Sequence, residues 1–300
     1  MSGTRSLIQG AELWIPTGEW LTLRSGAYGP HTEFARVSAR SRFRRGEGLP
    51  GAVWATQQAL VWHDLRTHFV RAEHAAAAGI DAAVGFPWFH GRELEGVLTL
   101  LLTASATSPG CVEVWNHDDT LDVLRHGGGL YADTKDFEGL SKLLQFPYAA
   151  GLPGLTWSRG IPTILDDVGA SSEFVRAESA RRAGLKRAIG VPFYRDRRVA
   201  HVLALIGSGT QCFVRACQLF GHGEHGLVSR ACFTEPPGVD ENALAREALA
   251  RDVWLSPRLP LVTPAPHDGL ETSTGARSEI LLTLPIHDGI RLRGVACFEF

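Results

Sequence analysis

The sequence has few of the features that mark secreted, membrane-bound or nucleic-acid-binding proteins. Its 5 cysteines in 300 residues are odd in number and never spaced as C-x-x-C, which suits a reducing cytoplasm better than a disulfide framework. Its 30 basic and 32 acidic side chains nearly cancel, which argues against a surface that coats nucleic acid or anionic lipid. The longest apolar run, residues 97–102, is far shorter than the roughly 18 residues of a membrane span. The first ten residues lack the apolar core of a signal peptide. We therefore expect a cytoplasmic globular protein with no nucleic-acid or membrane partner.

An internal repeat is the most informative feature that is present. The segment GLPGAVW at residues 48–54 returns 103 residues later as GLPGLTW at residues 151–157. Residues 69–87 match residues 174–192 at 11 of 19 positions. Such identity indicates a duplicated unit of about a hundred residues.

A weaker third copy follows the first two. Residues 285–295 repeat the glycine, proline and valine spacing of residues 87–97. Trp254 precedes a Leu-Pro step as Trp157 precedes an Ile-Pro step, but the GLPG segment and the FVRAE segment are missing there. We expect three units, residues 1–104, 105–209 and 210–300, the third degenerate and without the loop helix of the others.

The pattern within a unit predicts the element order ββ-α-α-β-α-ββ. Apolar alternation on both sides of a short polar turn predicts a hairpin at residues 11–23, 111–124 and 213–233. The GLPG segment is expected to form a turn before a short helix that ends near Trp54. An alanine-rich stretch ending at Gly79 predicts a helix with a glycine C-cap, and residues 82–102 predict a closing hairpin. The order describes an α+β fold, an antiparallel sheet with helices on one side.

The ordered set of GEGLPGAVW at residues 46–54, Asp64, Gly79, Pro87 and Val97 resembles the GAF domain, in the version common in bacterial sensory proteins. The resemblance covers essentially the whole chain in three copies. It implies an antiparallel sheet of five or six strands, with a small-molecule pocket between the sheet and the helices that cover it. It also implies roles in sensing and dimerisation. The long terminal helices of the family are not expected in units one and two, because residues 103–110 are too few to form one.

The resemblance implies a set of ligand-binding candidates around this pocket. In unit one they are Trp54, Trp62, Asp64, Phe69, Arg71 and Phe86. Their counterparts in unit two are Trp157, Asp167, Phe174, Arg176 and Val191.

Each candidate also has a structural alternative. Arg71 and Arg176 either bind an anionic ligand in bidentate fashion or form a surface ion pair with Asp64 or a neighbouring glutamate. The aromatic residues either stack on a ligand or pack in the core. Asp64 and Asp167 are expected to cap the next turn or helix.

No catalytic residue and no metal ligand is predicted, and the sequence identifies no cofactor. The histidines of the HGEH segment at residues 222–225 could approach zinc together with Cys217 and Cys232, but the segment occupies a hairpin-tip position and is expected to be a solvated turn. The free methionine sulfoxide reductases of the family need pocket cysteines. None of the five cysteines here falls between residues 54 and 79.

Three hypotheses on function follow. The first is a non-enzymatic sensor or regulatory protein that binds a small molecule or a protein partner, which includes a second copy of the chain. The second is an interaction scaffold whose pockets are filled by side chains. The third and least favoured is an enzyme similar to the free methionine sulfoxide reductases.

The apolar strands carry one further expectation. Residues 96–102 and 202–206 are apolar on both faces, which indicates burial on both sides of the sheet. With no terminal helix to cover the second face, we expect the sheets to bury these faces against one another or against a second chain.

Overall fold

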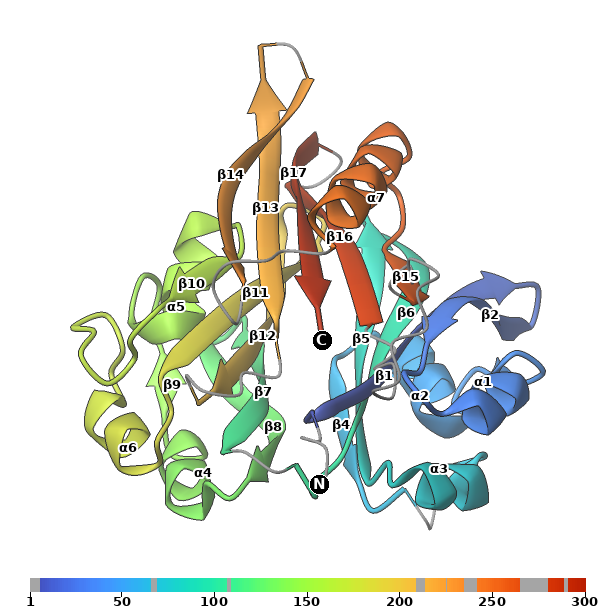
Figure 1. Ribbon diagram of the computed structural model, residues 1–300, viewed down its shortest axis with the longest axis horizontal. Helices are drawn as coiled ribbons and strands as arrows, with labels where there is room; N and C mark the ends of the chain where they lie inside the picture. The colour runs from blue at the N-terminus through green and yellow to red at the C-terminus, as the bar shows by residue number, and fades with distance from the viewer. Residues whose placement is uncertain are drawn as a thin grey trace, which may run out of the picture.

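Three antiparallel sheets and seven helices make up the described part of the chain (Figure 1). The computed structural model describes residues 6–65, 69–106, 109–208, 214–224, 226–234, 242–264, 280–288 and 291–300. Each sheet is built from one continuous stretch of sequence and carries its helices on one side. The α+β class and the tandem arrangement of similar units predicted from the sequence are confirmed.

Unit one forms a six-stranded sheet in the order β3-β2-β1-β6-β5-β4. Its strands are β1 (Ile8–Thr17), β2 (Trp20–Ala27), β3 (Arg42–Arg44), β4 (Leu60–His63), β5 (Ala82–His90) and β6 (Glu93–Leu102). Its helices are α1 (Thr32–Ser38), α2 (Gly48–Thr56) and α3 (Ala72–Ala78). The predicted element order is confirmed, with the short strand β3 added between the first two helices.

Unit two repeats this topology strand for strand, with the sheet order β9-β8-β7-β12-β11-β10. Its strands are β7 (Gly110–Asp118), β8 (Val123–Ala132), β9 (Gln145–Phe146), β10 (Thr163–Leu165), β11 (Arg187–Arg195) and β12 (Arg198–Gly207). Its helices are α4 (Lys135–Ser141), α5 (Gly151–Arg159) and α6 (Ala177–Arg182). The two GLPG segments therefore occupy the same place in the two units, as the repeat predicts.

The GLPG segment is the first turn of a helix, and the prediction of a separate turn before the helix is wrong. Gly48 begins α2 with a φ of 59°, in the left-handed region that favours glycine. A Cβ on Gly51 would lie 2.0 Å from the carbonyl oxygen of Arg44, so only glycine lets the helix approach the chain beside it. Gly151 and Gly154 meet the same two requirements in α5.

Unit three is a reduced copy with the sheet order β14-β13-β17-β16-β15. Its elements are β13 (Ala216–Gly223), β14 (Gly226–Thr234), α7 (Ala243–Leu255), β15 (Leu261–Pro264), β16 (Ile280–Asp288) and β17 (Arg291–Glu299). The HGEH segment lies at the tip of the β13–β14 hairpin, where Gly223 pairs with Gly226, so the predicted turn is confirmed there, while His225 lies outside the described residues. The expected absence of the loop helix concerns residues 265–279, which also lie outside them. Among the described helices, none is long and apolar enough to cross a membrane.

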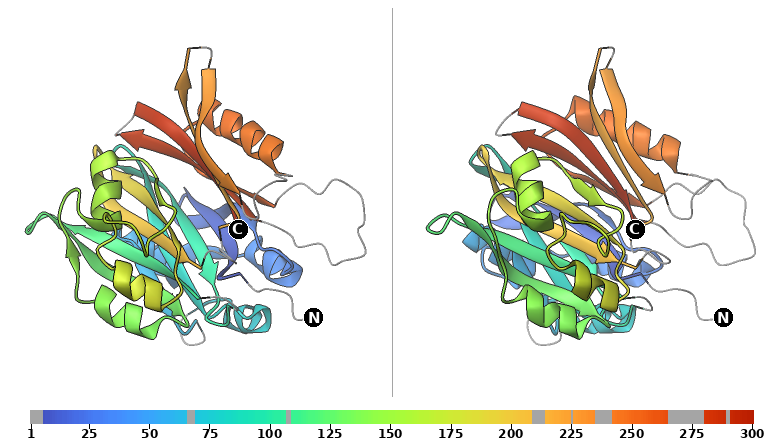
Figure 2. Two further views of the ribbon diagram at one scale, coloured as in Figure 1. Left: turned by 60° about the vertical axis from the view of Figure 1, so that its left-hand side comes forward. Right: turned by 90° about the vertical axis from the view of Figure 1, so that its left-hand side faces the viewer.

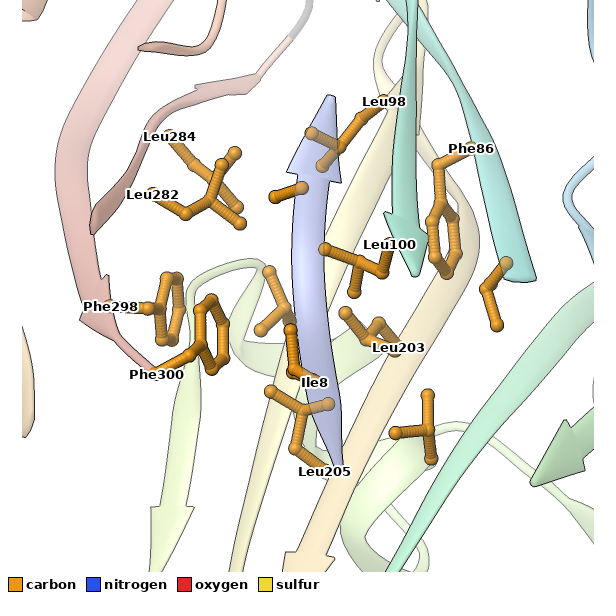
Figure 3. Packing of buried hydrophobic residues seen from close by; sticks show 14 of the residues in the cluster. Ile8, Phe86, Leu98, Leu100, Leu203, Leu205, Leu282, Leu284, Phe298 and Phe300 are labelled. Atoms are coloured by element: carbon orange, nitrogen blue, oxygen red, sulfur yellow. The ribbon is translucent and has the colours of Figure 1, made fainter. Parts of the chain in front are cut away.

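A shared core joins the three sheets (Figures 2 and 3). Leu98 and Leu100 of β6 point into it, while Val97 and Leu101 of the same strand pack against the helices of unit one. Residues of all three units meet in this core, among them Ile8, Phe86, Leu98, Leu100, Leu203, Leu205, Leu282, Leu284, Phe298 and Phe300. The prediction that the sheets bury their second faces against one another is confirmed.

The units meet in a repeating head-to-tail manner. Strand β4 of unit one contacts β8 of unit two, and β15 of unit three contacts β2 of unit one. Because β4 and β15 are equivalent edge strands and β2 and β8 are equivalent hairpin strands, the same two surfaces are used at both junctions. Such heterologous contacts tend to close into a ring when the rotation allows it.

Candidate functional site

The interior between the sheet and the helices of unit one is filled by large side chains. Trp14 and Phe43 meet edge to face at 4.8 Å between ring centroids, and Phe34 lies parallel to Phe69 at 6.5 Å. Leu49 and Val53 of α2 complete this cluster from the helix side. The place of the small-molecule pocket implied by the family resemblance is therefore a packed core.

A buried ion pair lies at the centre of that core. Arg71 is the residue that precedes α3, and Glu12 lies on the central strand β1. Both terminal nitrogens of Arg71 donate to the two carboxylate oxygens of Glu12, one of them at 2.9 Å, and one also donates to Ser38 Oγ. Trp14 Nε1 donates to the same carboxylate at 3.0 Å. Arg71 is 2% exposed and Glu12 is fully buried, so neither charge reaches water.

Unit two contains the same network in the equivalent positions. Arg176 donates to Glu113 at 2.5 Å and 2.9 Å and to Ser141 Oγ at 2.6 Å, and Trp115 Nε1 donates to Glu113 at 3.1 Å. Tyr131 adds a hydrogen bond from its hydroxyl to Glu113 at 3.1 Å. The same buried network is thus present in both units.

The network of unit two reaches further toward the surface than that of unit one. His126 Nε2 lies 2.9 Å from Tyr131 Oη, and Tyr131 in turn bonds to Glu113. The equivalent of His126 in unit one is Leu23, because Trp115 pairs with His126 as Trp14 pairs with Leu23. In unit two, His126 extends the hydrogen-bonded network outward. In unit one the equivalent network stops within the core, because Leu23 has no polar side-chain atom.

Electrostatics keep the buried pair of unit two charged. Burial raises the pKa of Glu113, but the charge and hydrogen bonds of Arg176 outweigh this and leave the pKa below its ordinary value. Burial likewise lowers the pKa of Arg176, and Glu113 reverses the effect and raises it. The guanidinium also lies 4.3 Å from the ring centroid of Phe137, a cation–π distance. A pair with these contacts is an ordered part of the core.

Unit three reaches the same arrangement with different residues. Arg246 of α7 donates to Glu299 of β17 at 2.5 Å, and its Nε lies 3.5 Å from Gln218 Oε1. Gln218 occupies the position of Glu12 and Glu113, because it pairs with Cys297 as Glu12 pairs with Thr99. The amide has replaced the carboxylate, and a neighbouring strand supplies the charge.

Neither Arg71 nor Arg176 is a surface group. The predicted alternative of a surface ion pair with Asp64 or a nearby glutamate is wrong, because Arg71 and Arg176 are each 2% exposed and pair with a strand carboxylate. The same contacts leave no terminal nitrogen of either guanidinium directed at an open space.

Sequence reasoning missed the carboxylate partners. Glu12 and Glu113 stand in a repeated E-x-W pattern on the first strand of each unit, and Ser38 and Ser141 each follow a phenylalanine by four residues. A charged residue inside an apolar strand at the same place in both copies was the available signal.

The structure does not bring the predicted ligand-binding residues into one pocket. Phe69 and Phe174 lie in the cores of units one and two, and Trp54 and Trp62 pack half-buried against the first. Phe86 lies on the opposite face of its sheet, stacked on Phe193 at 4.1 Å in the shared core. Its counterpart Val191 lies in the shared core too.

The predicted aspartates have different surroundings in the two units. Asp167 Oδ1 accepts hydrogen bonds from the backbone N–H groups of Gly169 and Ala170, each at 3.1 Å, which confirms its predicted capping role. Asp64 is exposed, has a φ of 51° and precedes residues 66–68, which lie outside the described residues.

Three hollows of the described surface lie outside the packed sheet–helix interiors. One of about 680 Å³ lies between hairpin tips of units one and two, and one of about 950 Å³ lies between β2 and the chain from α7 to β15. A third, of about 430 Å³, includes Trp157 among its lining residues. Trp157 is the one predicted candidate that lines any of these three hollows.

The buried thiols are held in their protonated form. Burial raises the pKa of Cys111, of Cys217 and of Cys297, the last to about 12. A protonated thiol is a weak nucleophile and a weak metal ligand. Within the described residues, no group of three or more histidine, cysteine or acidic side chains is placed to hold a metal ion.

No protein-family model matches the sequence, and no curated protein does. Among solved structures, the A. aeolicus nlh2 GAF domain in an inactive state is 23% identical over 32% of this chain and 58% of its own, with a TM-score of 0.27. The free methionine-R-sulfoxide reductase from Neisseria meningitidis is 21% identical over 33% of this chain and 51% of its own, with a TM-score of 0.26.

A third similar structure is the GAF domain/HD domain protein from Geobacter sulfurreducens. It is 12% identical over 32% of this chain and 61% of its own, with a TM-score of 0.27. The chain thus spans about half to three fifths of the length of these relatives. Each match covers a length close to that of one unit, and several of the similar structures are GAF domains, as the sequence resemblance predicts.

Proposed function

We propose that this chain is a non-enzymatic regulatory protein of the GAF type whose interiors are closed, and that it acts through its outer surface on a partner. Of the hypotheses drawn from the sequence, this joins the regulatory role to the scaffold with filled pockets. The partner is a protein, which includes a second copy of the chain, or a small molecule bound outside the sheet–helix interiors.

The observation that carries the proposal is the buried Arg–Glu pair in units one and two. A ligand entering either interior would have to separate Arg71 from Glu12 or Arg176 from Glu113. Breaking a buried pair and leaving one charge unpaired costs about 3–5 kcal/mol, beyond the cost of moving the surrounding aromatic rings. The interiors therefore favour packing over ligand entry.

The state of the cysteines supports the non-enzymatic part of the proposal. The thiols of Cys111, Cys217 and Cys297 are buried on strands, and burial raises the pKa of each. Thiol chemistry of the reductase kind needs an accessible thiolate. Cys232 is the exposed cysteine of the described residues, on the hairpin strand β14.

Native mass spectrometry of the chain purified from its own host tests the proposal. The expected spectrum shows the chain alone or with a protein partner, and with no small molecule dependent on the interiors. Denaturing spectra of the same sample supply the reference mass. A stoichiometric small molecule that is lost in Arg71→Met or Arg176→Met, variants that keep an unbranched apolar stem in place of the guanidinium, would overturn the closed interiors.

A further inference from the structure

Arginines gather where two equivalent hairpin tips meet at the junction of units one and two. The β5–β6 tip supplies Arg92, and the β11–β12 tip supplies Arg195, Arg197 and Arg198. All four line the open hollow of about 680 Å³. The two tips are equivalent in the repeat, and they meet where units one and two adjoin.

Direct bonds hold the two tips in place. The backbone N–H of Asp196 donates to the carbonyl oxygen of Gly91 at 2.6 Å, and Arg92 Nε donates to Asp196 Oδ2 at 3.0 Å. Asp196 has a φ of 59°, where the equivalent residue of unit one is Gly91 with a φ of 62°. An aspartate in the left-handed region is tolerated at a cost that glycine avoids, and here its side chain ties the tips together.

The charges that line the hollow do not cancel. Asp196 is paired with Arg92, and Asp119 lies between His117 and Arg198, at 3.1 Å and 4.0 Å. Arg195 donates to the neutral amide oxygen Oε1 of Gln57 at 2.9 Å. Within the part of the chain that the structure describes, neither Arg195 nor Arg197 has a carboxylate within ion-pair distance. Two guanidinium groups are thus left to attract an anion.

The residues that line the hollow differ from their equivalents in the other units. Arg198 stands where unit one has Glu93 and unit three has Arg291, and the neighbouring His201 stands where units one and three have Gly96 and Gly294. His201 lines the hollow, is almost fully buried and bonds through Nδ1 to Asn116 at 2.8 Å. Unit one therefore lacks the arginine of this tip, and among the described units a histidine stands at the position of His201 in unit two alone.

We propose that this hollow binds a small phosphate-bearing molecule, held by Arg195, Arg197 and Arg198 at the junction of units one and two. Guanidinium groups donate paired hydrogen bonds that match phosphate oxygens, and a concave cationic surface concentrates anions. The site lies outside the sheet–helix interiors, so it stands or falls independently of whether these are closed. A ligand here would contact both units and strengthen their junction.

Titration calorimetry with inorganic pyrophosphate tests the site in the full chain. Arg197→Ser/Arg198→Ser removes two lining arginines, and Arg181→Ser/Arg182→Ser, on the exposed surface of α6, is the matched control with the same change of charge. Because a charged hydrogen bond contributes strongly to affinity, we expect the first variant to bind at least about tenfold more weakly and the control to stay within about twofold of wild type. Arg198→Glu, which restores the residue of unit one, should weaken binding at least as much.

Three results would overturn the proposal. They are the absence of binding to wild type at about 10 mM pyrophosphate, an equal loss in the α6 control, and an unchanged affinity in Arg197→Ser/Arg198→Ser. Thermal unfolding of each variant establishes that it is folded. If Arg197→Ser/Arg198→Ser does not fold, the single exposed substitution Arg198→Glu decides the question on its own.

Discussion

Units two and three place a buried arginine under their sheets by different routes. In unit two, Arg176 precedes α6 and meets Glu113 on the first strand of the unit. In unit three, Arg246 lies within α7 and meets Glu299 on the last strand. The position of the charge pair between sheet and helix is retained while the residues that supply it differ. The comparison indicates that the fold favours a charge pair between sheet and helix, whichever helix and strand supply its two residues.

The two pairs differ in how completely they are enclosed. The Glu113 side chain is fully buried, whereas the Glu299 side chain is 8% exposed near the end of its strand. Arg176 also bonds to Ser141 and lies over the Phe137 ring, whereas the further partner of Arg246 described above is the Gln218 amide at 3.5 Å. The two arginine side chains are equally buried, at 1% exposed, so the difference between the pairs lies in the carboxylate: Glu299 keeps some contact with water, and its pair should contribute less to stability than the pair of Glu113.

Separating the units should have the largest effect. Excised unit one, ending at residue 106, would expose Leu98, Leu100 and Phe86, which the other sheets now cover. A soluble monomer does not tolerate an open apolar face of several hundred Å², so we expect this fragment to be unfolded or aggregated. Circular dichroism and light scattering measure this. A cooperative, monomeric fragment would show that each unit is stable alone.

Breaking the pair in unit two should destabilise the protein more than breaking the pair in unit three. We expect Glu113→Leu to lower the free energy of unfolding by about 3–5 kcal/mol, because it strands a buried guanidinium. Glu299→Leu should cost about 1–3 kcal/mol, in the range of a lost hydrogen bond to a charged group. Urea unfolding measures both.

Exposed Glu178, which pairs with Arg181, supplies the control for this pair of variants. Glu178→Leu should change the free energy of unfolding by less than about 1 kcal/mol, as for a surface ion pair. Equal costs for Glu113→Leu and Glu299→Leu would remove the difference in enclosure as an explanation.

Acid should destabilise the protein through a residue found in unit two alone. Burial, with the nearby charge of Arg195, lowers the pKa of His201 from 6.5 to about 4. The folded state resists protonation while the unfolded state does not, so stability falls as the pH drops from about 6.5 to 4, by up to about 3 kcal/mol. Unfolding free energies across this range should lose that part of their slope in His201→Gln. An unchanged slope would assign the acid sensitivity to other groups.

The repeat in the sequence was enough to predict the fold but not the contents of the site. Topology followed from matched segments such as GLPG, and burial of both sheet faces followed from strands such as residues 96–102. The roles of Arg71 and Arg176 did not follow, because a repeated arginine is equally consistent with binding a ligand and with an internal partner. Glu12 is 59 residues away from Arg71 in sequence, and only the folded chain shows that they meet.

The smallest effect should come from the histidine that extends the network of unit two. His126→Leu installs the residue that unit one has at the equivalent place, Leu23, and removes the hydrogen bond to Tyr131. We expect a change of no more than about 1 kcal/mol in unfolding free energy, because Tyr131 keeps its bond to Glu113. Urea unfolding at neutral pH is the measurement. A loss of several kcal/mol would mean that unit two, unlike unit one, depends on the whole chain of polar groups.

A double-mutant cycle on Glu113 and Arg176 tests most directly whether a buried pair organises the closed interior. The cycle uses Glu113→Leu, Arg176→Met and the double variant, with unfolding free energies measured in urea. If the pair acts as a unit, the double variant loses less than the sum of the two single losses, and the coupling free energy is about 2–4 kcal/mol. A coupling below about 0.5 kcal/mol, with the two single losses simply adding, would contradict the account.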